Sequence, residues 1–67
     1  MEISKEVKLA IIDNELQSIC QQIYHQTVVA KVSKSIDDME KVKSIEASLV
    51  KLEKAKYALE EIKKEVG

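Results

Sequence analysis

The sequence lacks most of the residues that interrupt helices or fill large cores. It has no Pro, no Trp and no Phe, and its one Gly is the last residue. Since Pro and Gly break helices and form tight turns, their absence from the interior favours long helices over a β-rich fold. The 67 residues have room for one domain only. Because a single core of this size supplies only about 3 to 5 kcal/mol, we expect stabilisation from outside the monomer.

Cysteine and histidine are equally scarce. Cys20 is the only cysteine, which excludes an intrachain disulfide and favours a reducing compartment such as the cytoplasm. His25 is the only histidine, and its distance of five residues from Cys20 does not bring the two side chains together on a helix. Zinc needs about four such ligands, and nucleophilic catalysis needs a base within reach. We therefore expect no metal, no cofactor and no enzymatic activity.

Arginine is absent as well. The eleven cationic residues are all Lys, and with twelve Asp and Glu residues they give a net charge of -1. Arg is the residue best suited to phosphates and base edges, and nucleic-acid-binding proteins usually have a basic patch. We therefore expect nucleic acid not to be the partner. A nucleic-acid-binding hairpin is kept as the alternative function, in which a dimer would gather four lysines on one face: Lys5, Lys8, Lys31 and Lys34.

Long apolar runs are also missing. No stretch approaches the about 18 residues of a membrane span. The first six residues, Met1 to Glu6, contain neither the basic nor the apolar block of a signal peptide. We therefore expect a cytoplasmic protein without a membrane partner.

Short polar residues cluster at one place, residues 33 to 38 near the midpoint. Ser35 with Asp38, and Asp37 with Glu40, both match a helix N-cap followed three residues later by an acid. We therefore predict an all-α, coiled-coil-like antiparallel hairpin with one helix over about 3–33, a turn at about 33–37 and a second helix over about 38–66. A single helix through the whole chain is the alternative.

Apolar residues follow a helical period in both arms. In the first arm the spacing alternates between three and four residues, as in a heptad seam, over Leu9, Ile12, Leu16, Ile19 and Ile23, with Gln26 and Ala30 continuing it. In the second arm the predicted seam is Ile45, Leu49, Leu52, Ala55, Leu59, Ile62 and Val66. The step from Leu52 to Ala55 is one residue short of a heptad, so we expect this seam to drift. A second, minor stripe comprises Met39, Val42, Val50 and Tyr57.

The most informative segment runs from Leu16 to Ala30 and contains no Asp, Glu, Lys or Arg. A surface helix normally has charges on its outer face, whereas neutral polar groups can be buried at lower cost than ions. We therefore predict that this helix contacts a second copy of the chain, so that two hairpins pair into a four-helix bundle as a homodimer or higher oligomer. A different protein is the second candidate for the partner. The predicted oligomer interface comprises Leu16, Gln17, Ile19, Cys20, Gln21, Ile23, Tyr24, His25, Gln26, Val28, Val29 and Val32.

Two residues of this segment have predicted individual roles. Cys20 is expected to be a small buried apolar residue beside the seam. Gln26, a polar residue at a seam position, is expected to fix the register of packing, as buried polar residues do in coiled coils.

A resemblance to known proteins lies in the second arm. The segments IDDMEKVK at 36–43, LVKLEKA at 49–55 and LEE at 59–61 resemble the second arm of small α-helical hairpin proteins of bacteriophages and prophages. The resemblance implies a helical hairpin of mostly uncharacterised function, located in the host cytoplasm if phage-encoded, and implies no site residues. The predicted architecture is also similar to that of the plasmid copy-number regulator, a hairpin that dimerises and binds paired RNA loops. We therefore predict a non-enzymatic protein–protein interaction module, such as an assembly or adaptor protein of a phage or mobile element.

Overall fold

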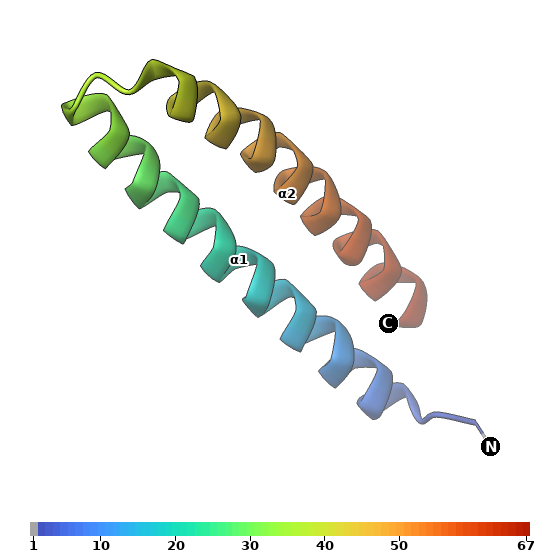
Figure 1. The fold of residues 1–67 in the computed structure, drawn as a ribbon. Coiled ribbons are helices and arrows are strands. Elements are labelled where there is room, and N and C mark those ends of the chain that lie inside the picture. The colour runs from blue at the N-terminus through green and yellow to red at the C-terminus, as the bar shows by residue number, and fades with distance from the viewer. Residues whose placement is uncertain (1) are drawn as a thin grey trace.

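The protein is an antiparallel hairpin of two long α-helices in the computed structural model, which describes residues 2–67 (Figure 1). Helix α1 spans Lys5–Ser35 and helix α2 spans Met39–Val66. The hairpin measures 52 × 17 × 14 Å, and both chain ends lie at the same end of this rod. No strand is present among the described residues. The predicted all-α hairpin is confirmed, and the alternative of one continuous helix is wrong.

Helix α1 begins at Lys5 because Ser4 caps it. Ser4 has an extended backbone, and its hydroxyl accepts a hydrogen bond of 3.2 Å from the backbone N–H of Val7. Such a cap satisfies one of the amides that have no partner within the first turn. Glu6 in the first turn adds a favourable interaction with the helix dipole. The helix therefore starts two residues later than predicted.

The connection between the helices is a Schellman motif. The N–H of Asp38 donates to the carbonyl of Ser33 at 2.9 Å, and the N–H of Asp37 donates to the carbonyl of Lys34 at 3.2 Å. Asp38 then caps α2, since its Oδ1 accepts from the N–H of Lys41 at 3.3 Å. Both predicted N-caps are wrong. Ser35 still belongs to α1, and Asp37 has the left-handed backbone that ends a helix instead of starting one.

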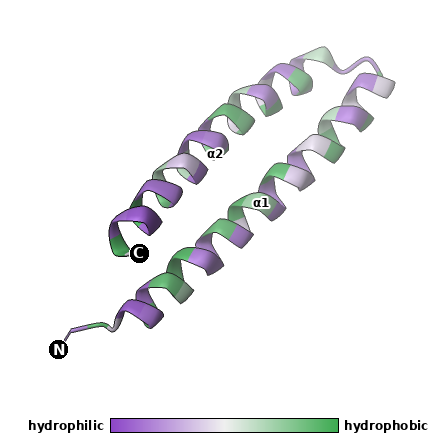
Figure 2. Cartoon of the chain, turned by 180° about the vertical axis from the view of Figure 1, so that it is seen from behind, coloured by the Kyte–Doolittle hydropathy of each residue, from purple (hydrophilic) through white to green (hydrophobic). Residues whose placement is uncertain are grey.

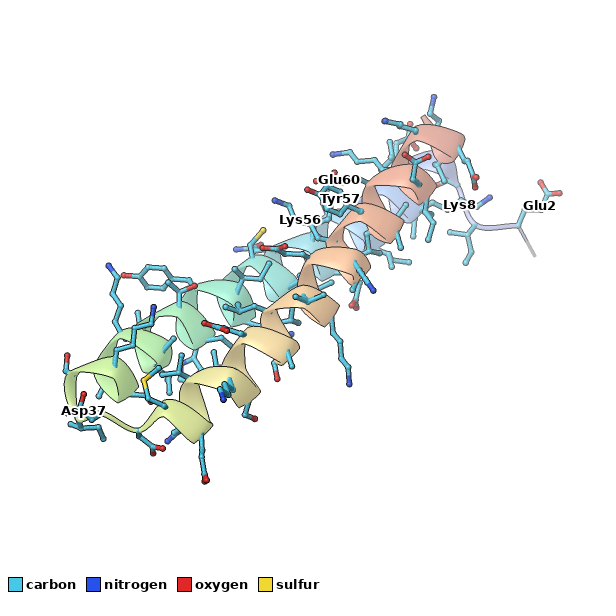
Figure 3. The ribbon with its side chains drawn as sticks, turned by 90° about the horizontal axis from the view of Figure 1, so that it is seen from above. Glu2, Lys8, Asp37, Lys56, Tyr57 and Glu60 are labelled. Carbon is cyan, nitrogen blue, oxygen red and sulfur yellow. The ribbon has the colours of Figure 1, made fainter. Side chains whose placement is uncertain are left out.

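Replacing Asp37 by Gly is expected to stabilise the hairpin. Among the described residues, Asp37 is the only one other than glycine with a positive φ, 60°, and it lies in the turn at one end of the rod (Figure 3). A side chain in this region costs up to about 1 kcal/mol, which Gly avoids. We expect Asp37→Gly to raise the melting temperature measured by circular dichroism by several degrees, about 4 to 8 °C for each kcal/mol.

Asp37→Ala is the matched control, because alanine keeps the Cβ that glycine removes but lacks the short polar side chain with which Asp adopts a left-handed backbone more readily than other residues. Its melting temperature is expected to fall below that of the parent. If the glycine variant melts no higher than the alanine variant, the backbone of residue 37 is not in the left-handed region.

The seam of α1 agrees with the prediction. Each predicted position, and Ser33 beyond them, is buried or half-buried: Leu9, Ile12, Leu16, Ile19, Ile23, Gln26, Ala30 and Ser33. Because the spacing alternates strictly between three and four residues, this stripe stays in contact with α2 along its whole length.

The seam of α2 follows a strict heptad, which differs from the prediction. Its members are Val42, Ile45, Leu49, Leu52, Lys56, Leu59, Lys63 and Val66, and all except Lys63 are buried or half-buried. Ala55 and Ile62 are exposed instead, so the expected drift is wrong. Val42, only 2% exposed, belongs to this seam and not to the minor stripe.

Two positions of the α2 seam are occupied by lysines, Lys56 and Lys63. The aliphatic stem can cover apolar surface while the ammonium group reaches water. Lys63 also places its Nζ 2.8 Å from Oδ1 of Asp13 on α1. Both side chains are about half exposed, so this ion pair contributes no more than about 1 kcal/mol. Figure 3 shows Lys56 beside Tyr57 and Glu60 on α2.

Two helices enclose very little apolar surface. Among the described residues, only three apolar side chains are buried: Ile12, Val42 and Ile45. The radius of gyration is 15.6 Å, whereas a globular chain of this length has about 11 Å. Hydrophobic residues are spread along both helices (Figure 2). Much of the apolar surface of this hairpin therefore faces water.

Candidate functional site

One face of α1 is uncharged over nearly the whole helix, and we call it the outer face of α1. It comprises Val7, Ile11, Asn14, Ser18, Gln21, His25, Val28 and Val32, all of them exposed. Their spacing alternates between four and three residues, the same period as the seam of α1. The two stripes are offset by about half a helical turn, so the outer face points away from α2.

The corresponding face of α2 has a different composition. Its residues are exposed as well, and they mix both signs of charge: Glu40, Ser44, Ala47, Lys51, Lys54, Ala58, Glu61 and Glu65. Charged residues are usual at positions opposite the seam of a helical hairpin, because these positions face water. The absence of Asp, Glu, Lys and Arg is therefore particular to α1.

Apolar side chains occupy both ends of the outer face. Val7 and Ile11 near the start of α1 are 49% and 50% exposed, and Val28 and Val32 near its end are 41% and 56% exposed. Contiguous exposed apolar residues with this regular spacing are typical of surfaces that bind another helix.

Polar side chains occupy the centre of the outer face. Five residues line a shallow hollow of about 280 Å³: Ser18, Gln21, Gln22, His25 and Gln26. The Nε2 of Gln22 donates to the hydroxyl of Ser18 at 3.3 Å. All five residues come from one helix, so the hollow is a surface depression with no opposite wall. Its amide, hydroxyl and imidazole groups can form hydrogen bonds with a partner that covers it.

The predicted interface residues fall on different sides of α1. Those that are exposed are Gln17, Cys20, Gln21, Tyr24, His25, Val28 and Val32. Those that are half-buried are Leu16, Ile19, Ile23, Gln26 and Val29, and the first four belong to the seam against α2. Cys20 was expected to be buried but is exposed, because a two-helix hairpin leaves the flanks of its seam open to water.

The predicted interface omitted the first four members of the outer face, and one of them, Ser18, lies inside the charge-free run. Val7, Ile11 and Asn14 lie before Leu16, where charged residues such as Lys8 and Glu15 interrupt the run. These charged side chains point to other sides of the helix. The signal that identifies the missed residues is the heptad position, read separately for each side of the helix, and not the run of consecutive residues.

Two other kinds of site, a metal site and a membrane-spanning helix, can be assessed from the described residues. Among residues 2–67, no three or more His, Cys, Asp or Glu side chains are grouped so that they could hold a metal ion. Over the same residues, neither helix combines the length and the apolar character that a membrane crossing requires. The feature of the described residues that distinguishes α1 from α2 is the uncharged outer face of α1.

The fold and this surface define the class of protein as a small two-helix hairpin with a long uncharged face. Comparison with protein-family models, with curated proteins and with solved structures found no match to the chain.

Proposed function

We propose that this chain is a non-enzymatic self-association module that forms a homodimer through the outer face of α1. The observation that supports the proposal is the complete absence of Asp, Glu, Lys and Arg from a stripe that runs from Val7 to Val32. A charge-free contact surface avoids the desolvation of ions, and its neutral polar groups can pair across the contact.

The amount of exposed surface also supports association. The hairpin exposes 5393 Å², whereas a compact monomer of this mass exposes about 4,300 Å². The hairpin therefore exposes about 1,100 Å² more than a compact monomer. This difference is larger than the area of about 800 Å² that each partner buries in a standard stable interface. The outer face of α1 is long enough for such a contact, since Val7 and Val32 are about 38 Å apart along the helix.

The proposed dimer contains four helices. Because the outer face of α1 lies opposite the seam, the two α1 helices are inside and the two α2 helices are outside. The mixed charges of α2 then face water, which keeps the assembly in solution. An assembly or adaptor role in a phage or mobile element stays a prediction of the sequence resemblance.

A molar mass measurement tests the proposal. Light scattering after gel filtration is expected to give twice the 7.6 kDa of one chain, with a shift toward the monomer on dilution. Circular dichroism on the same fractions checks that the chain is helical. A helical species of 7.6 kDa at the highest accessible concentration would contradict self-association.

No observation favours the nucleic-acid alternative in the hairpin itself. Lys8 lies toward the free ends of the rod, and the turn lies at the opposite end (Figure 3). Lys31 and Lys34 belong to the last turns of α1, next to that turn, about 35 Å along the helix from Lys8. The lysines named for this alternative therefore form no continuous basic face in one hairpin. RNA or DNA binding whose affinity falls steeply with salt would support the alternative.

A further inference from the structure

The outer face of α1 has the same pattern of apolar and polar residues in both directions along the helix. Its order along the helix is two apolar residues, four polar residues and two apolar residues: Val7, Ile11, Asn14, Ser18, Gln21, His25, Val28 and Val32. The centre of the pattern lies at the level of Ile19 and Cys20, and the members pair around it at equal distances. Such a palindrome is what one surface needs in order to contact an antiparallel copy of itself.

We infer that two copies of the hairpin associate by antiparallel pairing of their α1 helices, with a two-fold axis that passes between Ser18 and Gln21 of the outer face, at the level of residues 19 and 20. This inference rests on the proposed self-association. The pairing places Val7 opposite the partner's Val32 and Ile11 opposite the partner's Val28. Apolar residues then meet apolar residues at both ends of the contact, where water is excluded from their side chains.

The central residues fix the register. Asn14 faces the partner's His25, and Ser18 faces the partner's Gln21, so each polar group meets a hydrogen-bonding partner. A shift by one heptad in either direction places apolar residues such as Ile11 or Val28 against polar ones. Polar residues within an otherwise apolar contact specify register in this way, because misalignment leaves them unpaired.

The flanking residues introduce no repulsion. On one side of the antiparallel contact, Lys8 pairs with the partner's Val29 and Glu15 pairs with the partner's Gln22. On the other side, Lys31 pairs with the partner's Ala10. Each flanking pair contains at most one charged residue, whereas like charges in such pairs are what prevents helices from associating.

Parallel pairing is the competing arrangement. In a parallel pair every residue of α1 faces the same residue of the partner. Apolar residues then meet apolar residues in any sequence, so a parallel pair does not require the stripe to be a palindrome. The palindrome therefore favours the antiparallel arrangement, because only that arrangement needs the first half of the stripe to match the second half.

Disulfide cross-linking distinguishes the two arrangements. In a Cys20→Ser background, Ile11→Cys chains are mixed with Val28→Cys chains and oxidised under mild conditions. We expect the cross-linked product to join position 11 of one chain to position 28 of the other. The product is identified by intact mass, because the two variants differ in mass. Cysteines on parallel helices would instead join position 11 to 11 and position 28 to 28.

The controls separate this inference from the proposed function. A Ser44→Cys chain, with the cysteine on the outer face of α2, is expected to give no specific cross-link, and circular dichroism checks that all variants are helical. Like-to-like cross-links in a chain that is dimeric by light scattering would overturn the antiparallel pairing and leave self-association intact. A monomeric parent chain would overturn both.

A charge exchange provides a second measurement that needs no cysteine. Ile11→Glu and Val28→Lys chains are each expected to dimerise less well alone. Their mixture is expected to form heterodimers, because the antiparallel register places the new Glu opposite the new Lys and leaves one native apolar pair in place. A mixture that associates no better than either variant alone would overturn the antiparallel register.

Discussion

Val28→Lys is expected to convert the proposed dimer into folded monomers. Val28 is 41% exposed in the hairpin, so a lysine there remains hydrated in the monomer. In the proposed dimer, two-fold symmetry places this lysine in two apolar contacts, each of which costs about 1 to 3 kcal/mol. The total of about 2 to 6 kcal/mol weakens association at least about 30-fold. Sedimentation equilibrium measures the dissociation constant, and circular dichroism checks the helix content.

Val50→Lys is the matched control for this prediction. Val50 is 51% exposed and lies on α2, outside the proposed contact. The same chemical change at this position is expected to leave the dissociation constant within about twofold, since exposed substitutions away from packed features have small effects. If the two variants weaken association equally, or if Val28→Lys has no effect, the outer face of α1 is not the contact.

The contrast between the two helices shows which features of the fold a sequence can predict. The sequence predicts the seam of α1 residue by residue, because a large aliphatic residue, Leu or Ile, occupies every heptad position from Leu9 to Ile23. The hairpin itself followed from the cluster of short polar residues at the midpoint. These signals are local and depend only on helical periodicity.

The errors in α2 have one physical cause. Residue type suggested Ala55 and Ile62 as seam members, whereas the strict heptad places Lys56 and Lys63 there. A lysine in a two-helix seam is tolerated because the seam is narrow and water lies within reach of the ammonium group. Asp13, which pairs with Lys63, is 50 residues away in sequence, so no local pattern indicates the pair.

The N-cap of α2 could not be predicted for a related reason. Ser35, Asp37 and Asp38 are all good capping residues, and they lie within four positions of one another. The choice among them depends on where α1 ends, and α1 ends where the two seams bring the helices together. The Schellman motif ends α1 with the left-handed Asp37, so Asp38 is the first residue that can cap α2.

Ile45→Ala is expected to unfold most of the chain at low concentration. Ile45 is 6% exposed and is one of the three buried apolar residues among the described positions. Truncating a buried isoleucine to alanine costs about 2 to 5 kcal/mol, which is comparable with the about 3 to 5 kcal/mol that a core of this size supplies. The loss of helix measured by circular dichroism during urea unfolding gives the free energy. Dilute samples are needed, because the proposed dimer would gain stability as the concentration rises.

Ile62→Ala is the matched control, because it makes the same change on the same helix. Ile62 was predicted to be in the seam, but it is 45% exposed, and the neighbouring Lys63 occupies the heptad position. We expect its truncation to cost less than about 1 kcal/mol, since little apolar surface leaves contact with α1. Equal costs at Ile45 and Ile62 would mean that the seam of α2 drifts as the sequence first suggested. A large difference would support the strict heptad of the α2 seam, in which Lys63 and not Ile62 lies against α1.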